Sequence, residues 1–323
     1  MSHSDIMILR GVLDDDIAKL IKLKNYPFYQ FYKHQSSFAL RSIRRVWYKM
    51  NLPFMSLWYN KDILSSDAKK IVVMDSLCSP EYLRWLRKKK PDARIVFWYW
   101  NIAYNSIDPP RISDDLVEKW SFSRKDCIKY KMRFNPLPYF REVVFPSNEI
   151  VYDVIFVGKD KGRLSRLLEL RDAFDKLKLK TLFVITPDHP YSKNPEYSNR
   201  IGYLESMELG TKSKAVLDYI EIDDSGQSLR ILEALFMHKK IITNSKLIFD
   251  YDFYCPENIF VLGHDDIDKL PDFLSVPYKE MPEEMIMKYD FDSAIARCFD
   301  DERTVFDDML EQMRKSEIDA SKY

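Results

Sequence analysis

The sequence is poor in glycine, has no clustered cysteines and contains no long apolar run. Only seven of its 323 residues are glycine, against a usual share of about 7%, so we expect the retained glycines to serve special backbone geometry. The four cysteines are widely spaced without a C-x-x-C pair, and the five histidines do not cluster with them. This spacing argues against a zinc site or a disulfide framework. Because no stretch of about 18 apolar residues occurs, no membrane-spanning helix is predicted.

The sequence also lacks a net charge. Its 50 basic and 50 acidic residues balance, which excludes a chain-wide affinity for polyanions but leaves room for a local basic patch. A hydrophobic content of 46% with 14% aromatic residues is enough for folded cores, and the length predicts two domains. The N-terminal segment has no apolar signal core, so the expected location is the cytoplasm, including the inner face of the membrane.

The clearest candidate for a site is the stretch 225–235 (SGQSLRILEAL), which lies between the short apolar runs 215–220 and 240–243. A strand, a glycine turn, a helix and a second strand are typical of half of a doubly wound α/β sheet. In such sheets ligands bind at the carboxyl ends of the strands, where helix N-termini offer unpaired N–H groups to anions. We therefore predict an α/β fold with a site at the first turn of this helix, formed by Gly226, Gln227 and Ser228.

Two interpretations of this helix are open. Arg230 and Glu233 are three residues apart and share one face, which is typical of a surface ion pair on an amphipathic core helix. The alternative is a nucleotide-sugar site, in which Arg230 and the helix N-terminus bind a diphosphate and Glu233 binds the ribose hydroxyls. Thr243 and Asn244 end the following strand and are then expected near the base or the diphosphate.

A second glycine turn, GKDKGR from Gly158 to Arg163, follows the apolar run 151–157. Its cations Lys161 and Arg163 suit a phosphate at a helix N-terminus, and a plain polar turn is the alternative. The motif is neither a P-loop nor a dinucleotide fingerprint. We predict that this turn and the Gly226 turn meet in space and bind one diphosphate together, with cations taking the place of a metal.

Carboxylates in the first half of the chain are candidates for a general base. Asp75 ends the apolar run 70–75, and a carboxylate at a strand end can serve as a base or simply cap the next helix. Asp108 lies in a proline-rich break after the strongly apolar run 93–100. The D-x-D spacings at 266–268 and 290–292 are expected by chance in a chain with this many acidic residues, and no metal site is predicted there.

The stretch 31–50 combines basic and aromatic residues at helical spacing. One interpretation is a helix on an anionic membrane surface, with contact through Arg41, Arg44, Arg45 and Trp47. The other is a helix that packs its aromatic side chains inward and leaves its basic face in water. Nucleic acid is not an expected partner, because no binding-module motif accompanies the patch. The run 53–59 (PFMSLWY) is predicted to be a strand.

Several of these segments resemble bacterial glycosyltransferases that build capsule and lipopolysaccharide. The resemblance covers about residues 70 to 295 and rests on GQSLRILEAL, KKIITN, YDVIFVGKDKGR, FWYWN and WSFSRKDCIKYKMRFN. It implies two Rossmann-like domains facing each other across a cleft, the GT-B fold, with a proline-bearing boundary at 135–146. We expect an acceptor domain at 1–145, a nucleotide-sugar donor domain at 146–285 and closing helices at 286–323.

The resemblance also implies a function. The expected reaction is metal-independent transfer of a hexose from a nucleotide-diphosphate donor, most simply a uridine diphosphate sugar, to a saccharide or lipid-linked saccharide, without a cofactor. Retaining members often carry two glutamates eight residues apart here; the second matches Glu233, but the first position is Ser225, so the stereochemical outcome is not implied. A catalytically silent binding subunit and a nucleotide-sugar epimerase on the same fold are the alternatives.

Overall fold

The computed structural model describes residues 3–11, 15–34, 37–50, 52–146, 149–189, 191–220 and 226–320. The chain forms two compact units, which are described separately below. The first comprises Met1–Pro136 and Ile295–Tyr323, and the second comprises Leu137–Ala294. The terminal helices are thus divided, because the chain from Ile295 onward packs with the first unit. Within the described ranges, no helix has both the length and the apolar character needed to cross a lipid bilayer.

The first unit is built on a six-stranded parallel sheet with the order β2-β1-β3-β4-β5-β6. The strands that form its centre are rich in β-branched and aromatic residues and are almost wholly buried, as expected for a sheet covered on both faces. The strands are β1 (Ile6–Arg10), β2 (Phe28–Gln30), β3 (Lys70–Met74), β4 (Arg94–Tyr99), β5 (Glu118–Ser121) and β6 (Arg133–Phe134).

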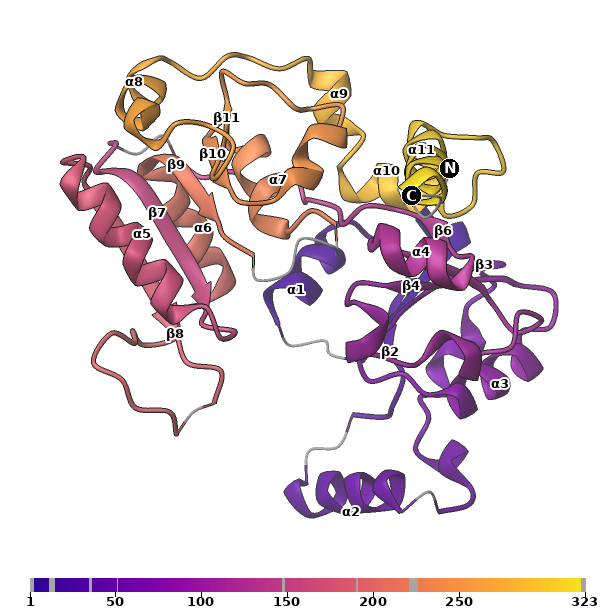
Figure 1. The fold of residues 1–323 in the computed structure, drawn as a ribbon. Helices are drawn as coiled ribbons and strands as arrows, with labels where there is room; N and C mark the ends of the chain where they lie inside the picture. The colour runs from indigo at the N-terminus through magenta and orange to yellow at the C-terminus, as the bar shows by residue number, and fades with distance from the viewer. Residues whose placement is uncertain are drawn as a thin grey trace. The chain divides into compact units, whose positions relative to one another are not determined.

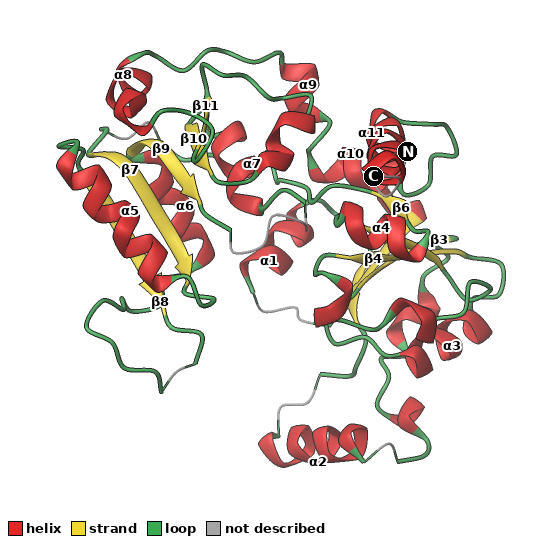
Figure 2. Ribbon diagram, viewed as in Figure 1, coloured by secondary structure: helices red, strands yellow, loops and turns green. Residues whose placement is uncertain are grey.

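The helices of the first unit, except the C-terminal α11, connect these strands (Figures 1 and 2). They are α1 (Asp16–Leu23), α2 (Phe38–Lys49), α3 (Pro80–Lys89), α4 (Arg124–Tyr130) and, from the C-terminal segment, α11 (Val305–Ala320). The predicted strand at 53–59 is wrong. Phe54 takes a left-handed backbone conformation with φ 63°, and Met55–Leu57 form a 3-10 turn after it.

The second unit is built on a five-stranded parallel sheet with the order β11-β10-β9-β7-β8. Its strands are β7 (Tyr152–Lys159), β8 (Thr181–Thr186), β9 (Ser213–Asp218), β10 (Lys240–Thr243) and β11 (Ile259–Val261). Its helices are α5 (Leu164–Lys176), α6 (Tyr203–Thr211), α7 (Leu229–Phe236), α8 (Leu270–Ser275), α9 (Glu283–Met287) and the start of α10 (Phe291–Arg297).

Both sheets share one topological feature. In each, the second strand along the chain lies on one side of the first strand, and the third lies on the other side. The strand order therefore reverses between β1 and β3 in the first unit and between β7 and β9 in the second. In open α/β sheets, ligands bind at the carboxyl ends of the strands at such a switch point.

Candidate functional site

The switch point of the second unit is spanned by one side chain, Arg230 of α7. Its Nε donates a hydrogen bond to the Val157 carbonyl of β7 at 3.0 Å, and its Nη1 pairs with the Asp218 carboxylate that ends β9. The guanidinium also lies over the Phe156 ring, 5.2 Å from its centroid. Arg230 thus joins the two strands between which the order reverses, and it places a positive charge at their carboxyl ends.

Gly158 allows this close approach. A Cβ at Gly158 would lie 2.9 Å from Nη2 of Arg230 and 3.2 Å from the Phe156 ring, so a side chain here would force the end of the arginine to shift. The glycine turn after β7 and the helix that follows Gly226 therefore lie against each other. Glycine at this position leaves space for the guanidinium.

Arg163, in the same turn, serves the backbone. It is buried, and its guanidinium donates hydrogen bonds to the carbonyl of Lys159 at 3.0 Å, to that of Asp160 at 3.1 Å and to that of Tyr219. These bonds tie the turn after β7 to the segment after β9. Arg163 therefore acts on a ligand through the charge it adds to the turn, while its donors are directed at carbonyl oxygens.

Lys161, like Lys159, is an exposed cation of the turn. Its backbone is left-handed with φ 50°, and its ammonium group has no hydrogen-bond or ion-pair partner in the part of the chain that the structure describes. Desolvation lowers its pKa, and the positive charges of Arg163, Arg230 and Lys159 lower it further. A cation held among other cations is stabilised by an anion, so this arrangement favours binding of a negatively charged ligand.

The first turn of α7 uses its side chains inside the unit. Gly226 has a φ of 94°. Gln227 is buried: its Oε1 accepts a hydrogen bond from the Tyr251 hydroxyl at 2.7 Å, and its Nε2 donates to the Leu137 carbonyl at 3.4 Å. Ser228, the N-cap residue, donates its hydroxyl to Asp218 at 2.7 Å and does not cap the helix. Among the described residues, no side chain caps the first N–H groups of α7, and such groups suit an anion.

Glu233 is buried one turn further along α7, with 7% of its surface exposed. Burial raises its pKa to about 7, although the charge of Arg230 and a hydrogen bond with Tyr203 act to lower it. The interpretation of Arg230 and Glu233 as a surface ion pair is wrong, because Arg230 pairs with Asp218 instead. Glu233 is a carboxyl group that titrates near neutral pH.

Thr243 and Asn244 stabilise the ends of neighbouring strands. Thr243 is fully buried, and its hydroxyl accepts a hydrogen bond from the Ser245 amide at 3.1 Å. The Asn244 amide group bonds both backbone groups of Ile220, accepting from its N–H at 2.8 Å and donating to its carbonyl at 2.7 Å. Asn244 thus continues the pairing of β9 and β10 beyond the strands, and it shapes the rim of the site.

Asp218 is the residue of this site that the sequence argument missed. It is almost fully buried, it pairs with Arg230 and Ser228, and its Oδ2 has no hydrogen-bond partner among the described residues. The available signal was its place as the only charged residue of the apolar run 215–220 (AVLDYI). Ser225, where the resemblance departs from its pattern, lies outside the described residues.

A polar pocket of about 520 Å³ lies at the carboxyl ends of β3 and β4 in the first unit. Asp75 is buried there and accepts hydrogen bonds from the amides of Trp100 and Asn101, each at 3.3 Å, and from the Asn101 side chain at 3.1 Å. Burial raises the pKa of Asp75, against the opposing effect of these hydrogen bonds. The pocket is also lined by Tyr48, Cys78, Glu81, Ser106 and Arg111.

The structure excludes one of the two interpretations of Asp75, that it caps the next helix. The N-cap of α3 is Ser79, whose hydroxyl accepts a hydrogen bond from the Tyr82 amide at 3.2 Å, so Asp75 is not the cap. Asp108 is exposed at the start of a short 3-10 turn and does not line the pocket. Across the described ranges, no group of three or more His, Cys, Asp or Glu side chains is arranged to hold a metal ion.

The comparisons with known proteins concern the fold. No protein-family model and no curated protein sequence matches the chain. A solved structure of the apo form of the lipopolysaccharide outer core galactosyltransferase WaaB matches with a TM-score of 0.51 and 12% identity, over 90% of this chain and 97% of that one. Sucrose-phosphate synthase from Thermosynechococcus elongatus matches with a TM-score of 0.53 and 10% identity, over 98% of this chain and 100% of that one.

These matches extend over nearly the whole of both chains. They confirm the predicted fold: two Rossmann-like α/β units of the GT-B class. The resemblance to glycosyltransferases stated from the sequence is thus supported at the level of the fold, and one of the matching structures is an enzyme of lipopolysaccharide synthesis.

Proposed function

We propose that the chain is a glycosyltransferase that moves a hexose from a nucleotide-diphosphate donor to a saccharide or lipid-linked saccharide in surface-polysaccharide biosynthesis. The observation that carries the proposal is the switch point of the second unit, where Arg230, Lys161 and the N-terminus of α7 come together, and no described side chain caps that helix. Sharing a fold with two enzymes of sugar chemistry supports it.

The charges at this switch point suit a diphosphate. A diphosphate leaving group gains negative charge as the sugar departs, and fixed positive charge at that position lowers the barrier. Nη2 of Arg230 has no hydrogen-bond partner among the described residues, so it can donate to a phosphate oxygen, as can Lys161. Arg163 contributes its positive charge to the site, while its own donors bond backbone carbonyls. We propose that uridine diphosphate is the nucleotide and that these cations stabilise it without a metal.

Glu233 is the proposed contact to the ribose. It lies on the face of α7 that carries Arg230, and a carboxyl group with a pKa of about 7 can accept or donate a hydrogen bond at neutral pH. Sugar hydroxyls need both kinds of partner. Thr243 and Asn244 contribute by holding the strand ends in place beside the nucleotide.

The polar pocket of the first unit is the proposed acceptor site. Its carboxyl, amide, hydroxyl and guanidinium groups match the hydrogen-bonding capacity of a saccharide. Asp75 is the proposed general base of an inverting reaction, because a carboxylate with a raised pKa removes a proton from a hydroxyl more effectively. Asp108 is the second candidate and would act from the exposed segment that precedes Arg111.

The test is calorimetric titration of uridine diphosphate into the wild-type protein and into Lys161→Asn. Asparagine tolerates the left-handed backbone at this position, and no contact between described side chains is lost. We expect an affinity at least about 10-fold lower, the loss of one charge-assisted contact, with unchanged or higher thermal stability. Proton uptake at alkaline pH should accompany wild-type binding, because a bound anion raises the lowered pKa of Lys161.

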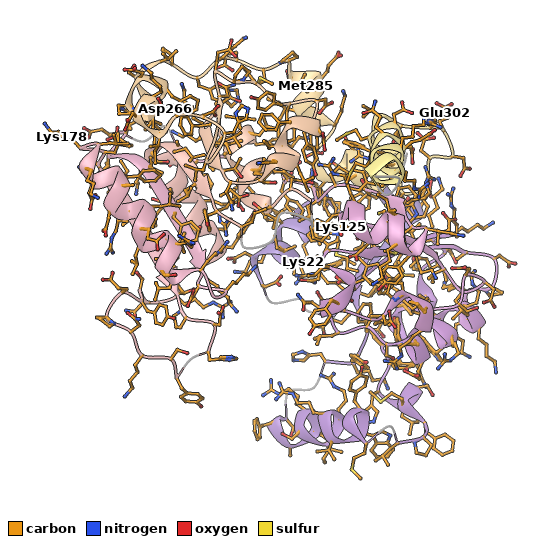
Figure 3. All side chains as sticks on the ribbon, viewed as in Figure 1. Lys22, Lys125, Lys178, Asp266, Met285 and Glu302 are labelled. Atoms are coloured by element: carbon orange, nitrogen blue, oxygen red, sulfur yellow. The ribbon has the colours of Figure 1, made fainter. Side chains whose placement is uncertain are left out.

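Lys178→Asn is the matched control. Lys178 also has a left-handed backbone, with φ 59°, but it follows the C-terminal end of α5, whereas Lys161 precedes the N-terminal end. Figure 3 shows the labelled Lys178 side chain at that end of the helix. The Lys178→Asn variant should bind uridine diphosphate with the affinity of the wild type. Equal affinity of all three proteins, or no binding at all, would remove the diphosphate site.

Turnover separates the alternatives. A transferase consumes the donor when an acceptor is supplied, a silent binding subunit binds the donor without consuming it, and an epimerase converts the donor without an acceptor. Chromatography of the nucleotide sugars after incubation with and without acceptor distinguishes all three.

A further inference from the structure

The helix α2 (Phe38–Lys49) is amphipathic and carries no acidic residue. Its sequence is FALRSIRRVWYK, and at 100° per residue its apolar side chains from Leu40, Ile43 and Val46 fall on one face, while Arg41 and Arg45 fall on the opposite one. Such a helix normally buries its apolar face against its own domain.

The contacts of α2 with its own unit come from the Leu40 edge of the apolar face, where Arg44 and Trp47 also fall at 100° per residue. Arg44 lies over the Tyr32 ring, 4.8 Å from its centroid. The Trp47 indole donates a hydrogen bond to the Pro53 carbonyl at 2.9 Å and packs edge-on against Trp58. Arg44 and Trp47, two of the residues expected to contact a membrane, therefore attach this edge of the helix to the unit, and Ile43 and Val46 on the rest of the apolar face stay exposed.

The apolar face of α2 is exposed together with the turn that follows it. Figure 1 shows α2 lying apart from the sheet of its unit. Phe54, in a left-handed backbone conformation, is 74% exposed. We call this surface the docking face; it consists of Leu40, Ile43, Val46, Met50, Phe54 and Leu57.

We propose that the docking face binds the surface of an anionic lipid bilayer. A patch of this many large apolar side chains on a soluble unit marks an interaction site. The surface is convex, since a single helix and a turn present it, which fits a bilayer better than a groove-binding peptide. The arginines on the polar face of α2 reach anionic headgroups while the apolar side chains enter the headgroup–acyl boundary.

A neighbouring pocket supports the same orientation. It has a volume of about 460 Å³ and is bounded by the end of α2, the 3-10 turn and α3. Trp47, Tyr48 and Trp85 line it together with the cations Arg84 and Lys88. Aromatic rings and cations side by side are typical of the depth at which lipid headgroups lie.

Docking would also place the polar pocket of Asp75 next to the bilayer. Tyr48 and Glu81 line both pockets, so the polar pocket adjoins the pocket that Phe54 of the docking face lines. Resting on the proposed function, this means that the acceptor saccharide is presented from the membrane and enters the polar pocket while its lipid stays in the bilayer.

The test is co-sedimentation of the full chain, without nucleotide, with vesicles of phosphatidylglycerol and phosphatidylethanolamine and with vesicles of phosphatidylcholine alone. We expect binding to the anionic vesicles that weakens with salt. Ile43→Asp with Val46→Asp should lower the partition coefficient by roughly 100-fold, since two apolar side chains leave the interface. Arg41→Gln with Arg45→Gln should lower it by about 30-fold, a factor of about 5 for each charge.

Val144→Asp is the matched control, because Val144 is exposed in the second unit and should leave vesicle binding unchanged. Circular dichroism and uridine diphosphate titration of the Ile43/Val46 variant show whether the fold and the donor site are intact, so that failure here is separate from failure of the proposed function. Absence of wild-type binding to anionic vesicles, or equal binding to phosphatidylcholine vesicles, would overturn the proposal. So would a wild-type chain that is a dimer in solution while the Ile43/Val46 variant is a monomer.

Discussion

The two switch points of this molecule have the same topology, but among the described residues only that of the second unit has a charged side chain between its two strands. In the second unit, Gly158 leaves room for Arg230, which crosses from β7 to β9. In the first unit, the corresponding gap between β1 and β3 is closed by backbone: a Cβ at Gly11 would lie 2.2 Å from the carbonyl oxygen of Ser76. The polar pocket opens one strand further on, where Asp75 and Asn101 follow β3 and β4.

This comparison separates location from specificity. The strand order decides that both units present loops at the carboxyl ends of their strands. The side chains at those ends decide what can bind there: cations in the second unit suit an anion, whereas a carboxyl group and amides in the first suit hydroxyl groups. The following substitutions test whether each unit has the role that its charges indicate.

The largest effect is expected from Asp75→Asn in the first unit. If Asp75 is the general base, kcat should fall by about 10²- to 10⁴-fold, with the dissociation constant for uridine diphosphate unchanged. Asn keeps the shape of the side chain, and burial of a neutral amide avoids the penalty that raises the pKa of Asp75. Transfer assays and calorimetry measure the two quantities. An unchanged kcat would assign Asp75 to holding the Asn101 loop.

Arg230→Ala should cost stability as well as affinity. It leaves the buried Asp218 carboxylate without its cation, and breaking a buried pair in this way costs about 3–5 kcal/mol. Denaturant unfolding measures the loss, and Asp218→Asn in the same chain should restore part of it. Arg166→Ala is the control, because its pair with Glu169 is on the surface and contributes less than about 0.5 kcal/mol. Equal losses would refute the bridging role of Arg230.

Glu233→Gln should change the pH dependence of stability. The folded-state pKa of about 7 lies above the usual 4.5, so the carboxyl group favours folding most below about pH 4.5, and this contribution is lost as pH rises through 7. The variant does not lose this contribution. Between pH 5 and pH 8 its free energy of unfolding should therefore rise by on the order of 3 kcal/mol relative to that of the wild type. Parallel pH profiles of both proteins would contradict a buried, titrating Glu233.

Much of the fold was predictable because its signals are local. Apolar runs such as 70–75 and 151–157 predicted strands correctly, since strands buried on both faces need continuous apolar sequence. The turns at Gly158 and Gly226 were predictable from a local signal as well, because the chain otherwise avoids glycine. The run 53–59 misled, because its apolar residues are exposed on the docking face and not buried in a sheet.

The partners of the polar side chains were not predictable. Arg230 pairs with Asp218, twelve residues away, and Arg163 bonds the carbonyl of Tyr219, 56 residues away. No local sequence pattern predicts pairs so far apart in the sequence, because these pairs follow from the crossover that brings β7 beside β9.

The sequence by itself determined the two parallel α/β units, the positions of the glycine turns and the amphipathic character of α2, since hydrophobic periodicity and glycine act within a few residues. Only the tertiary structure decided that the Lys161 ammonium has no hydrogen-bond or ion-pair partner among the described residues, that Glu233 is buried and that Ile43 and Val46 of α2 are exposed. Burial and pairing depend on which strands and helices become neighbours, and that is a property of the whole fold.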